Sequence, residues 1–131
     1  MALQKKIEDN KGIEKTYHRI SKIDFNIEDK TIQATVKSYK NVDYRNKEKR
    51  YLELQKLIAD KEKALALQEI KEDDDTYVGY LAEMEYTPYS TVLSTDVYTL
   101  ENIDINANIT VADVYTKLKE RHGIFIDALD I

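Results

Sequence analysis

The sequence predicts an α+β fold, in which an antiparallel β-sheet packs with one long central helix and one short C-terminal helix. Three observations favour this class. The first third alternates apolar and polar residues, residues 44–70 are rich in helix formers without Gly or Pro, and a capping pattern precedes residues 111–120. A chain of 131 residues has the length of one ordinary domain, so we expect 1–131 to form a single α+β domain.

The first expected element is a β-hairpin. Residues 13–27 place Ile13, Tyr17, Ile23, Phe25 and Ile27 on one parity, as in a half-buried strand. Residues 28–30 indicate a tight turn, and the β-branched stretch 31–39 suits the second strand. His18 lies on the opposite parity, where we expect a structural role.

A long helix is expected from Tyr44 to Ile70. Its apolar side chains follow helical spacing and form a stripe of Tyr51, Leu54, Leu57, Ile58 and Leu65. A seven-residue repeat runs from Tyr44 through Ile58 to Leu65, but its complementary positions hold a single apolar residue, Leu54. The stripe therefore packs either on the chain's own sheet or, less consistently with the pattern, on a partner helix.

The acids at 72–75 indicate a solvated turn that leads into a strand. In residues 77–86, one parity holds the side chains Val78, Tyr80, Ala82, Met84 and Tyr86, and Pro88 ends the stretch. A calcium loop starting at Asp73 fails, because Val78 would replace the required glycine and Met84 the bidentate acid. A second extended stretch at 90–100 is expected to pair with this strand or to extend the sheet.

The C-terminal part predicts a capped helix. Thr110 suits the N-cap, Asp113 stands three residues later as in a capping box, and basic residues gather in the last turn. Gly123 is expected to end the helix in a left-handed conformation. The apolar segment 124–131 should tuck against the domain or insert into a neighbour.

Residue chemistry gives no support for catalysis. The chain has no cysteine, and its two histidines, His18 and His122, stand in no metal-ligand spacing. It has no nucleophile elbow, phosphate loop or dinucleotide fingerprint. We therefore expect no enzyme activity, cofactor or metal. Nucleic acid is disfavoured because acids interrupt the basic stretch 37–63, and a membrane partner because no apolar run reaches spanning length. A cytoplasm, or a particle assembled there, is the expected location.

Charge and tyrosine distribution point instead to surface recognition. Residues 1–71 hold 17 Lys/Arg against 12 Asp/Glu, and residues 72–131 hold 3 against 13. Folding either mixes these charges or lets a basic surface of one copy dock on an acidic surface of the next. Tyrosines crowd between 77 and 98, where they either cover the sheet or bind protein or saccharide. The expected interaction residues are Tyr77, Leu81, Tyr89, Tyr98, Tyr51 and Ile58.

Several segments resemble small tail-region proteins encoded by phages and prophages of Gram-positive bacteria. The resemblance rests on "TYHRISKI" at 16–23, "IQATVKSYKN" at 32–41, the "YTPYS" turn and the closing "NITVADVYTKLKE" with "FIDALDI". It implies a virion component near the tail tip or baseplate, made in the host cytoplasm, without cofactor, which forms homo-oligomers and binds other tail proteins. It assigns no functional residue. The alternative is a small module that recognises a cell-wall saccharide or inhibits a host protein.

Overall fold

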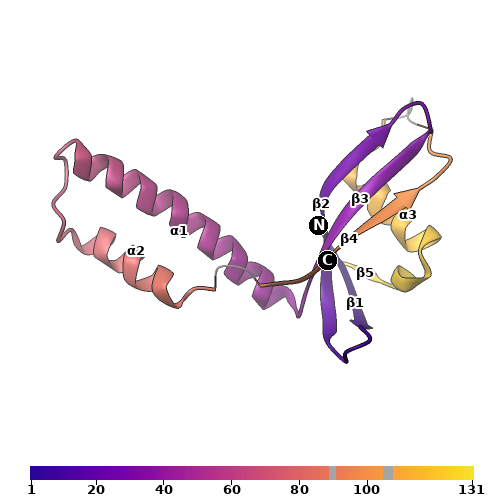
Figure 1. Ribbon diagram of the computed structural model, residues 1–131, viewed down its shortest axis with the longest axis horizontal. Helices are drawn as coiled ribbons and strands as arrows, with labels where there is room; N and C mark the ends of the chain where they lie inside the picture. The colour runs from indigo at the N-terminus through magenta and orange to yellow at the C-terminus, as the bar shows by residue number, and fades with distance from the viewer. Residues whose placement is uncertain (89–90, 105–107) are drawn as a thin grey trace. The chain divides into compact units, whose positions relative to one another are not determined.

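The computed structural model describes residues 1–88, 91–104 and 108–131. Over these residues the protein is α+β, with a five-stranded antiparallel sheet and three α-helices (Figure 1). The chain divides into two compact units. The sheet unit comprises Met1–Val42 and Val92–Ile131, and the helical unit comprises Asp43–Thr91. In sequence, the helical unit is inserted between two neighbouring strands of the sheet. The single-domain assignment stays a prediction.

The sheet has the strand order β4-β3-β2-β1-β5, and each neighbouring pair is antiparallel. Its strands are β1 (Leu3–Glu8), β2 (Glu14–Asn26), β3 (Thr31–Tyr39), β4 (Val92–Leu100) and β5 (Leu129–Asp130). The predicted hairpin is confirmed as β2 and β3, and the extended stretch 90–100 is confirmed from Val92 onward as β4, which extends the sheet beside β3. Strands β1 and β5 were not predicted.

The first turn of the sheet shows why β1 forms. Between β1 and β2, one side-chain oxygen of Asp9 accepts hydrogen bonds from the backbone N–H groups of Lys11 (2.8 Å) and Ile13 (3.0 Å). Gly12 has φ +79°, a left-handed conformation that glycine adopts without a Cβ clash. These residues close a tight connection, so the short segment before it can pair with β2.

The helix α3 (Val111–Arg121) packs on one face of this sheet (Figure 1). Its buried residues Val114, Tyr115 and Leu118 join a core with side chains from β3 and β4. The predicted capping box is confirmed: the Thr110 hydroxyl accepts from the Asp113 N–H, and the Asp113 carboxylate accepts from the Thr110 N–H. The hydrogen bond from the Thr110 N–H holds the pKa of Asp113 below its ordinary value.

The end of α3 corrects one prediction and confirms another. His122 is the C-cap and has φ −114°, and Gly123 begins the 3-10 helix η1 (Gly123–Phe125), so the left-handed stop at Gly123 is wrong. The backbone turns here in an extended conformation that needs no glycine. The tail does tuck against the sheet unit, because Phe125 and Ala128 are buried in its core.

The parity predicted for β2 is wrong in its first half. A β-bulge between Ile20 and Lys22 shifts the register against β3. Before the bulge, His18 and Ile20 pair with Ser38 and Val36, and after it Ile23 pairs with the buried Ala34. A bulge inserts one residue and therefore exchanges the two faces of a strand. His18 consequently lies on the core face, and Tyr17 lies on the other.

The largest difference between the sequence prediction and the structure lies in the helical unit. It contains the long helix α1 (Val42–Ala66), which matches the helix predicted for Tyr44–Ile70 except that it ends at Ala66, and a second helix, α2 (Asp75–Tyr86). The stretch 77–86 is therefore helical and not a strand. Asp74 is the N-cap of α2, and its carboxylate accepts a hydrogen bond from the Tyr77 N–H at 3.0 Å.

The acids before α2 explain why the helix forms. A carboxylate at a helix N-terminus satisfies free backbone N–H groups and interacts favourably with the helix dipole. The predicted solvated turn is therefore also a helix start. Tyr77, Tyr80 and Met84 are half-buried and follow helical spacing, a pattern that the alternation of apolar residues obscured. Pro88 follows the C-cap Thr87, because proline ends a helix as readily as it ends a strand.

Candidate interaction surface

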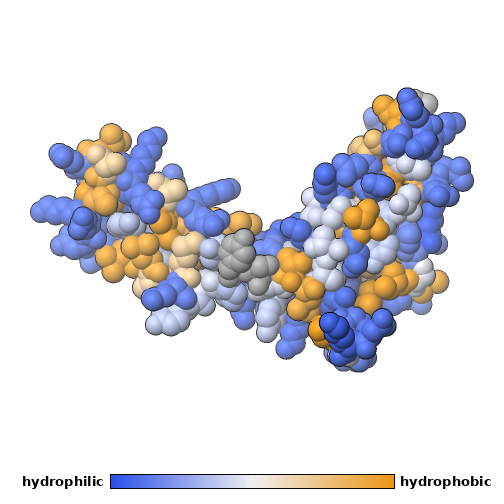
Figure 2. Space-filling view, viewed as in Figure 1, coloured by the Kyte–Doolittle hydropathy of each residue, from blue (hydrophilic) through white to orange (hydrophobic). Residues whose placement is uncertain are grey.

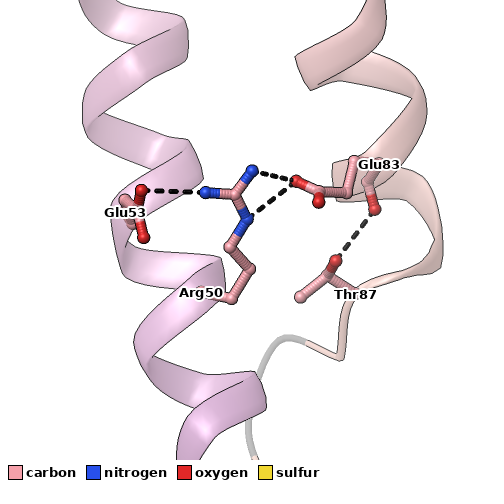
Figure 3. A network of polar contacts seen from close by, with 4 residues as sticks. All are labelled: Arg50, Glu53, Glu83 and Thr87. Carbon is pink, nitrogen blue, oxygen red and sulfur yellow. Dashed lines mark hydrogen bonds and ion pairs between the residues drawn. The ribbon is translucent and has the colours of Figure 1, made fainter.

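Helices α1 and α2 form an antiparallel pair with an ion pair toward each end. Arg50, near the start of α1, donates from Nε and Nη2 to one oxygen of Glu83 near the end of α2, at 2.9 and 2.7 Å (Figure 3). Toward the other end, the Lys61 ammonium lies 3.7 Å from the carboxylate of Asp74. Early residues of one helix thus meet late residues of the other, which defines the antiparallel direction.

Arg50 is the centre of a small polar network. Its Nη1 donates to Glu53 at 2.8 Å, one turn along α1, and the Thr87 hydroxyl donates to the backbone carbonyl of Glu83 at 2.8 Å (Figure 3). The hydrogen bond to Glu83 raises the pKa of the Arg50 guanidinium above its ordinary value. These groups are partly exposed, so the network fixes the direction of the helix pair more than its stability.

The apolar stripe predicted on α1 lies on the face that meets α2. Residues 50, 54, 58 and 61 share one side of a helix, and Arg50 and Lys61 reach α2 from that side. Between them, Leu54 is 0% exposed and Ile58 is buried. Tyr51 and Tyr77 are half-buried. Of the expected interaction residues, Ile58 therefore belongs to the packing of the helical unit.

The side of α2 that faces away from α1 is exposed and apolar. Val78 is 48% exposed, Leu81 is 43% exposed and Tyr86 is 86% exposed, and Figure 2 shows hydrophobic residues on the surface over this helix. The helix carries Asp75, Glu83 and Glu85 and no basic residue. We call the side with Val78, Leu81, Ala82, Glu85 and Tyr86 the α2 outer face. It is the strongest candidate interaction surface of the helical unit.

Only part of the expected interaction set lies on this surface. Leu81 belongs to it. Val78 and Tyr86 were not among the expected residues, because the strand prediction put them on the parity opposite Tyr77 and Leu81. The helical signal was present in the Asp74 cap and in the spacing of Tyr77, Tyr80 and Met84. Tyr89 lies outside the described residues.

Tyr98 belongs to the sheet unit. Its ring makes edge-to-face contacts with Phe125 and His122, with centroid distances of 5.1 and 5.0 Å. Burial raises the pKa of its hydroxyl above the ordinary value, and the nearby Asp96 carboxylate acts in the same direction. Such a half-buried ring stabilises the core beside α3.

His18 is a deeply buried titratable side chain of the sheet unit, at 1% exposure. Its Nε2 lies 2.8 Å from the backbone carbonyl of Lys5, which can only accept, so Nε2 carries the proton. Its Nδ1 then accepts from the Ser38 hydroxyl at 2.7 Å. Burial lowers the pKa of the imidazole, which is therefore neutral and fully hydrogen-bonded. His18 therefore has the structural role that the sequence predicts.

The sheet unit has a polar hollow of about 410 Å³ at the end of the β2–β3 hairpin. It is lined by Asp24, Phe25, Asn26, Asp29, Thr31, Gln33 and Thr99. Phe25 is half exposed, and the amide of Asn26 donates to the carboxylate of Asp29 at 2.9 Å. The hollow combines one aromatic ring with amide and carboxylate groups, a composition that suits a small polar ligand.

Within the described ranges, no group of three or more His, Asp or Glu residues is placed to hold a metal ion. No helix over the same residues is long and apolar enough to cross a membrane. Comparison of the chain with protein-family models, with curated proteins and with solved structures found no match.

Proposed function

We propose that this chain is a structural protein of a phage virion, a tail or baseplate component that works by self-assembly and by docking to other tail proteins. The observation that carries the self-assembly is the α2 outer face, where Val78, Leu81 and Tyr86 are exposed on a helix whose charged residues are all acidic. An exposed apolar patch rimmed by polar residues is typical of protein interaction sites.

The unequal charge of the chain supports the same proposal. The first 71 residues carry an excess of five positive charges and the remainder an excess of ten negative charges. Complementary charges on two copies steer association and fix register. The resemblance to phage tail-region proteins supplies the virion context, with assembly in the cytoplasm of a Gram-positive host, and the work proposed is not catalytic.

A saccharide-binding module is the second candidate, and the polar hollow beside Phe25 favours it. Sugars stack on aromatic rings and hydrogen-bond to amides and carboxylates such as those of Gln33, Asn26 and Asp24. In this alternative the chain would work as a monomer that recognises a cell-wall polymer of the host.

Light scattering coupled to size-exclusion chromatography distinguishes the assembly role from the saccharide-binding role. A mass that corresponds to a stable oligomer, and that persists on dilution, supports the assembly role. A monomer that is retained on isolated Gram-positive cell walls, and released when Phe25→Ala is introduced, supports the saccharide module and contradicts assembly.

A further inference from the structure

The side of α1 turned away from α2 carries its own stripe. Its residues are Lys49, Leu52, Lys56, Ala59 and Lys63, each three or four positions after the one before, and all are exposed. This spacing places them on one face of the helix. The face lies opposite Leu54 and Ile58, which pack inside the unit. We call it the α1 outer face.

Lysines dominate the charge of the α1 outer face. Asp60 lies beside the stripe, and Glu53 is held by Arg50 through a 2.8 Å hydrogen bond. Leu52 is 48% exposed in the middle of the stripe. Lysine stems can cover an apolar partner while their ammonium groups stay in water. The face therefore alternates lysines with the apolar side chains of Leu52 and Ala59.

The α2 outer face has the matching character. Val78, Leu81 and Ala82 form its apolar centre, and Asp75 and Glu85 border it. Tyr77, Tyr80 and Met84 point to the other side of the helix, where they are half-buried. An apolar centre flanked by acids fits a stripe in which lysines alternate with apolar residues, because both burial and charge favour the contact.

We propose that the α2 outer face of one copy of this chain packs on the α1 outer face of a second copy. This inference rests on the proposed self-assembly and names the surfaces that carry it. The lysines, Lys56 at their centre, would meet Asp75 and Glu85 of the neighbouring copy. The packing of Val78 and Leu81 on Leu52 and Ala59 would provide most of the affinity, since apolar contacts at an interface centre dominate its energy.

The geometry makes this contact head-to-tail. On one helix pair the two outer faces point away from each other, so each copy offers one surface of each kind. Such heterologous contacts close into a ring or continue as a filament. The 12 residues of α2 span about 18 Å and the 25 residues of α1 about 37 Å. The α1 outer face, from Lys49 to Lys63, spans about 21 Å of α1, so one α2 covers most of it.

Charge reversal tests the contact on the full chain. Sedimentation velocity over a range of concentrations would compare wild type with Lys56→Glu, Glu85→Lys and the double variant. Each single reversal should weaken self-association by about three- to tenfold, and the double variant should restore it to within about twofold, because the pair is exchanged. Lys11→Glu, an exposed reversal in the β1–β2 turn, is the matched control and should change nothing.

A second variant tests the apolar centre. Val78→Asp places a charge on an exposed position of α2 and should weaken association more than about tenfold, with its helix content by circular dichroism unchanged. If wild type associates and none of these variants differs from Lys11→Glu, another surface carries the assembly and this inference is wrong while the proposed function stands. If wild type is monomeric at every concentration, both fail.

Discussion

Leu54 is expected to hold α2 on α1, and its truncation gives the sharpest test of the helical unit. The side chain is 0% exposed, and it lies between Arg50 and Lys61 on the face that meets α2. Leu54→Ala removes buried methyl groups and leaves a cavity, which costs about 2–5 kcal/mol in comparable sites. That is a large share of the roughly 5–15 kcal/mol that stabilises an ordinary domain.

Leu52→Ala is the matched control. It makes the same chemical change two residues earlier on the same helix, at a side chain that is 48% exposed. Both variants change helix propensity equally, so the difference between their losses of stability measures the effect of burial. Surface substitutions of this kind usually stay within about 0.5 kcal/mol.

Hydrogen exchange of the α2 amides in dilute protein is the assay. A loss of about 2 kcal/mol corresponds to exchange faster by about thirtyfold, since about 1.4 kcal/mol is a factor of ten. Leu54→Ala should therefore accelerate exchange in Asp75–Tyr86 by about thirtyfold or more, and Leu52→Ala by less than about threefold. Equal exchange in the two variants would show that this face of α1 does not hold α2, and the assignment of inner and outer faces would be wrong.

Three further predictions concern single sites. Because burial lowers the pKa of His18, the unfolded chain binds its proton more readily, so wild-type stability should be constant above about pH 6.5 and should fall as the pH decreases below it. The urea midpoint, measured between about pH 5.5 and 7.5, reports this change in stability. The decrease in stability at low pH should be smaller in His18→Gln and unchanged in His122→Gln. Gly79→Ala should stabilise α2 by about 0.5–1 kcal/mol, because alanine favours a helix over glycine and nothing lies within 4 Å of the added Cβ. The thermal midpoint should rise, and a lower midpoint would contradict the assignment of residue 79 to a helix. Thr110→Ala should cost about 0.5–2 kcal/mol through loss of the α3 cap, and Thr110→Ser, which keeps the hydroxyl, should recover most of it in the same denaturation experiment.

The strands and helices with clear periodicity could be predicted from the sequence. Buried and more exposed residues alternate over most of residues 31–39, which form β3, and the capping pair Thr110 and Asp113 indicates the start of α3. The stretch 77–86 could not be assigned by periodicity alone, because its apolar residues satisfy both a period of two and helical spacing. The deciding signal is local: an acid at position 74 accepts from the backbone three residues later and starts a helix.

Long-range effects account for the other differences. The bulge after Ile20 reverses the face on which His18 lies, and no residue type in the strand marks it. β5 contains two residues and forms because the chain end returns to β1, where Ala2 and Ile131 exchange backbone hydrogen bonds of 2.9 and 3.0 Å. Pairing of this kind depends on the tertiary fold and leaves little trace in sequence.

Only part of the expected interaction set lies on the α2 outer face. The sequence pointed to assembly through charge and tyrosine content, and Leu81 is on the exposed face. The strand assignment, however, gave the wrong neighbours, so Val78 and Tyr86 were missed. Ile58 was predicted as an interaction residue because stripes on a long helix suit partners as well as cores, and it proved to be buried in the helical unit.

Cross-linking between copies tests the central claim most directly, because the chain contains no cysteine of its own. A Val78→Cys protein is mixed with an Ala59→Cys protein and treated with a short bismaleimide, with Lys11→Cys as the control partner. The account predicts that the cross-linked dimer forms mainly in the Val78→Cys and Ala59→Cys mixture, and little in either protein alone. A mixture that cross-links no more than the Lys11→Cys control would contradict it.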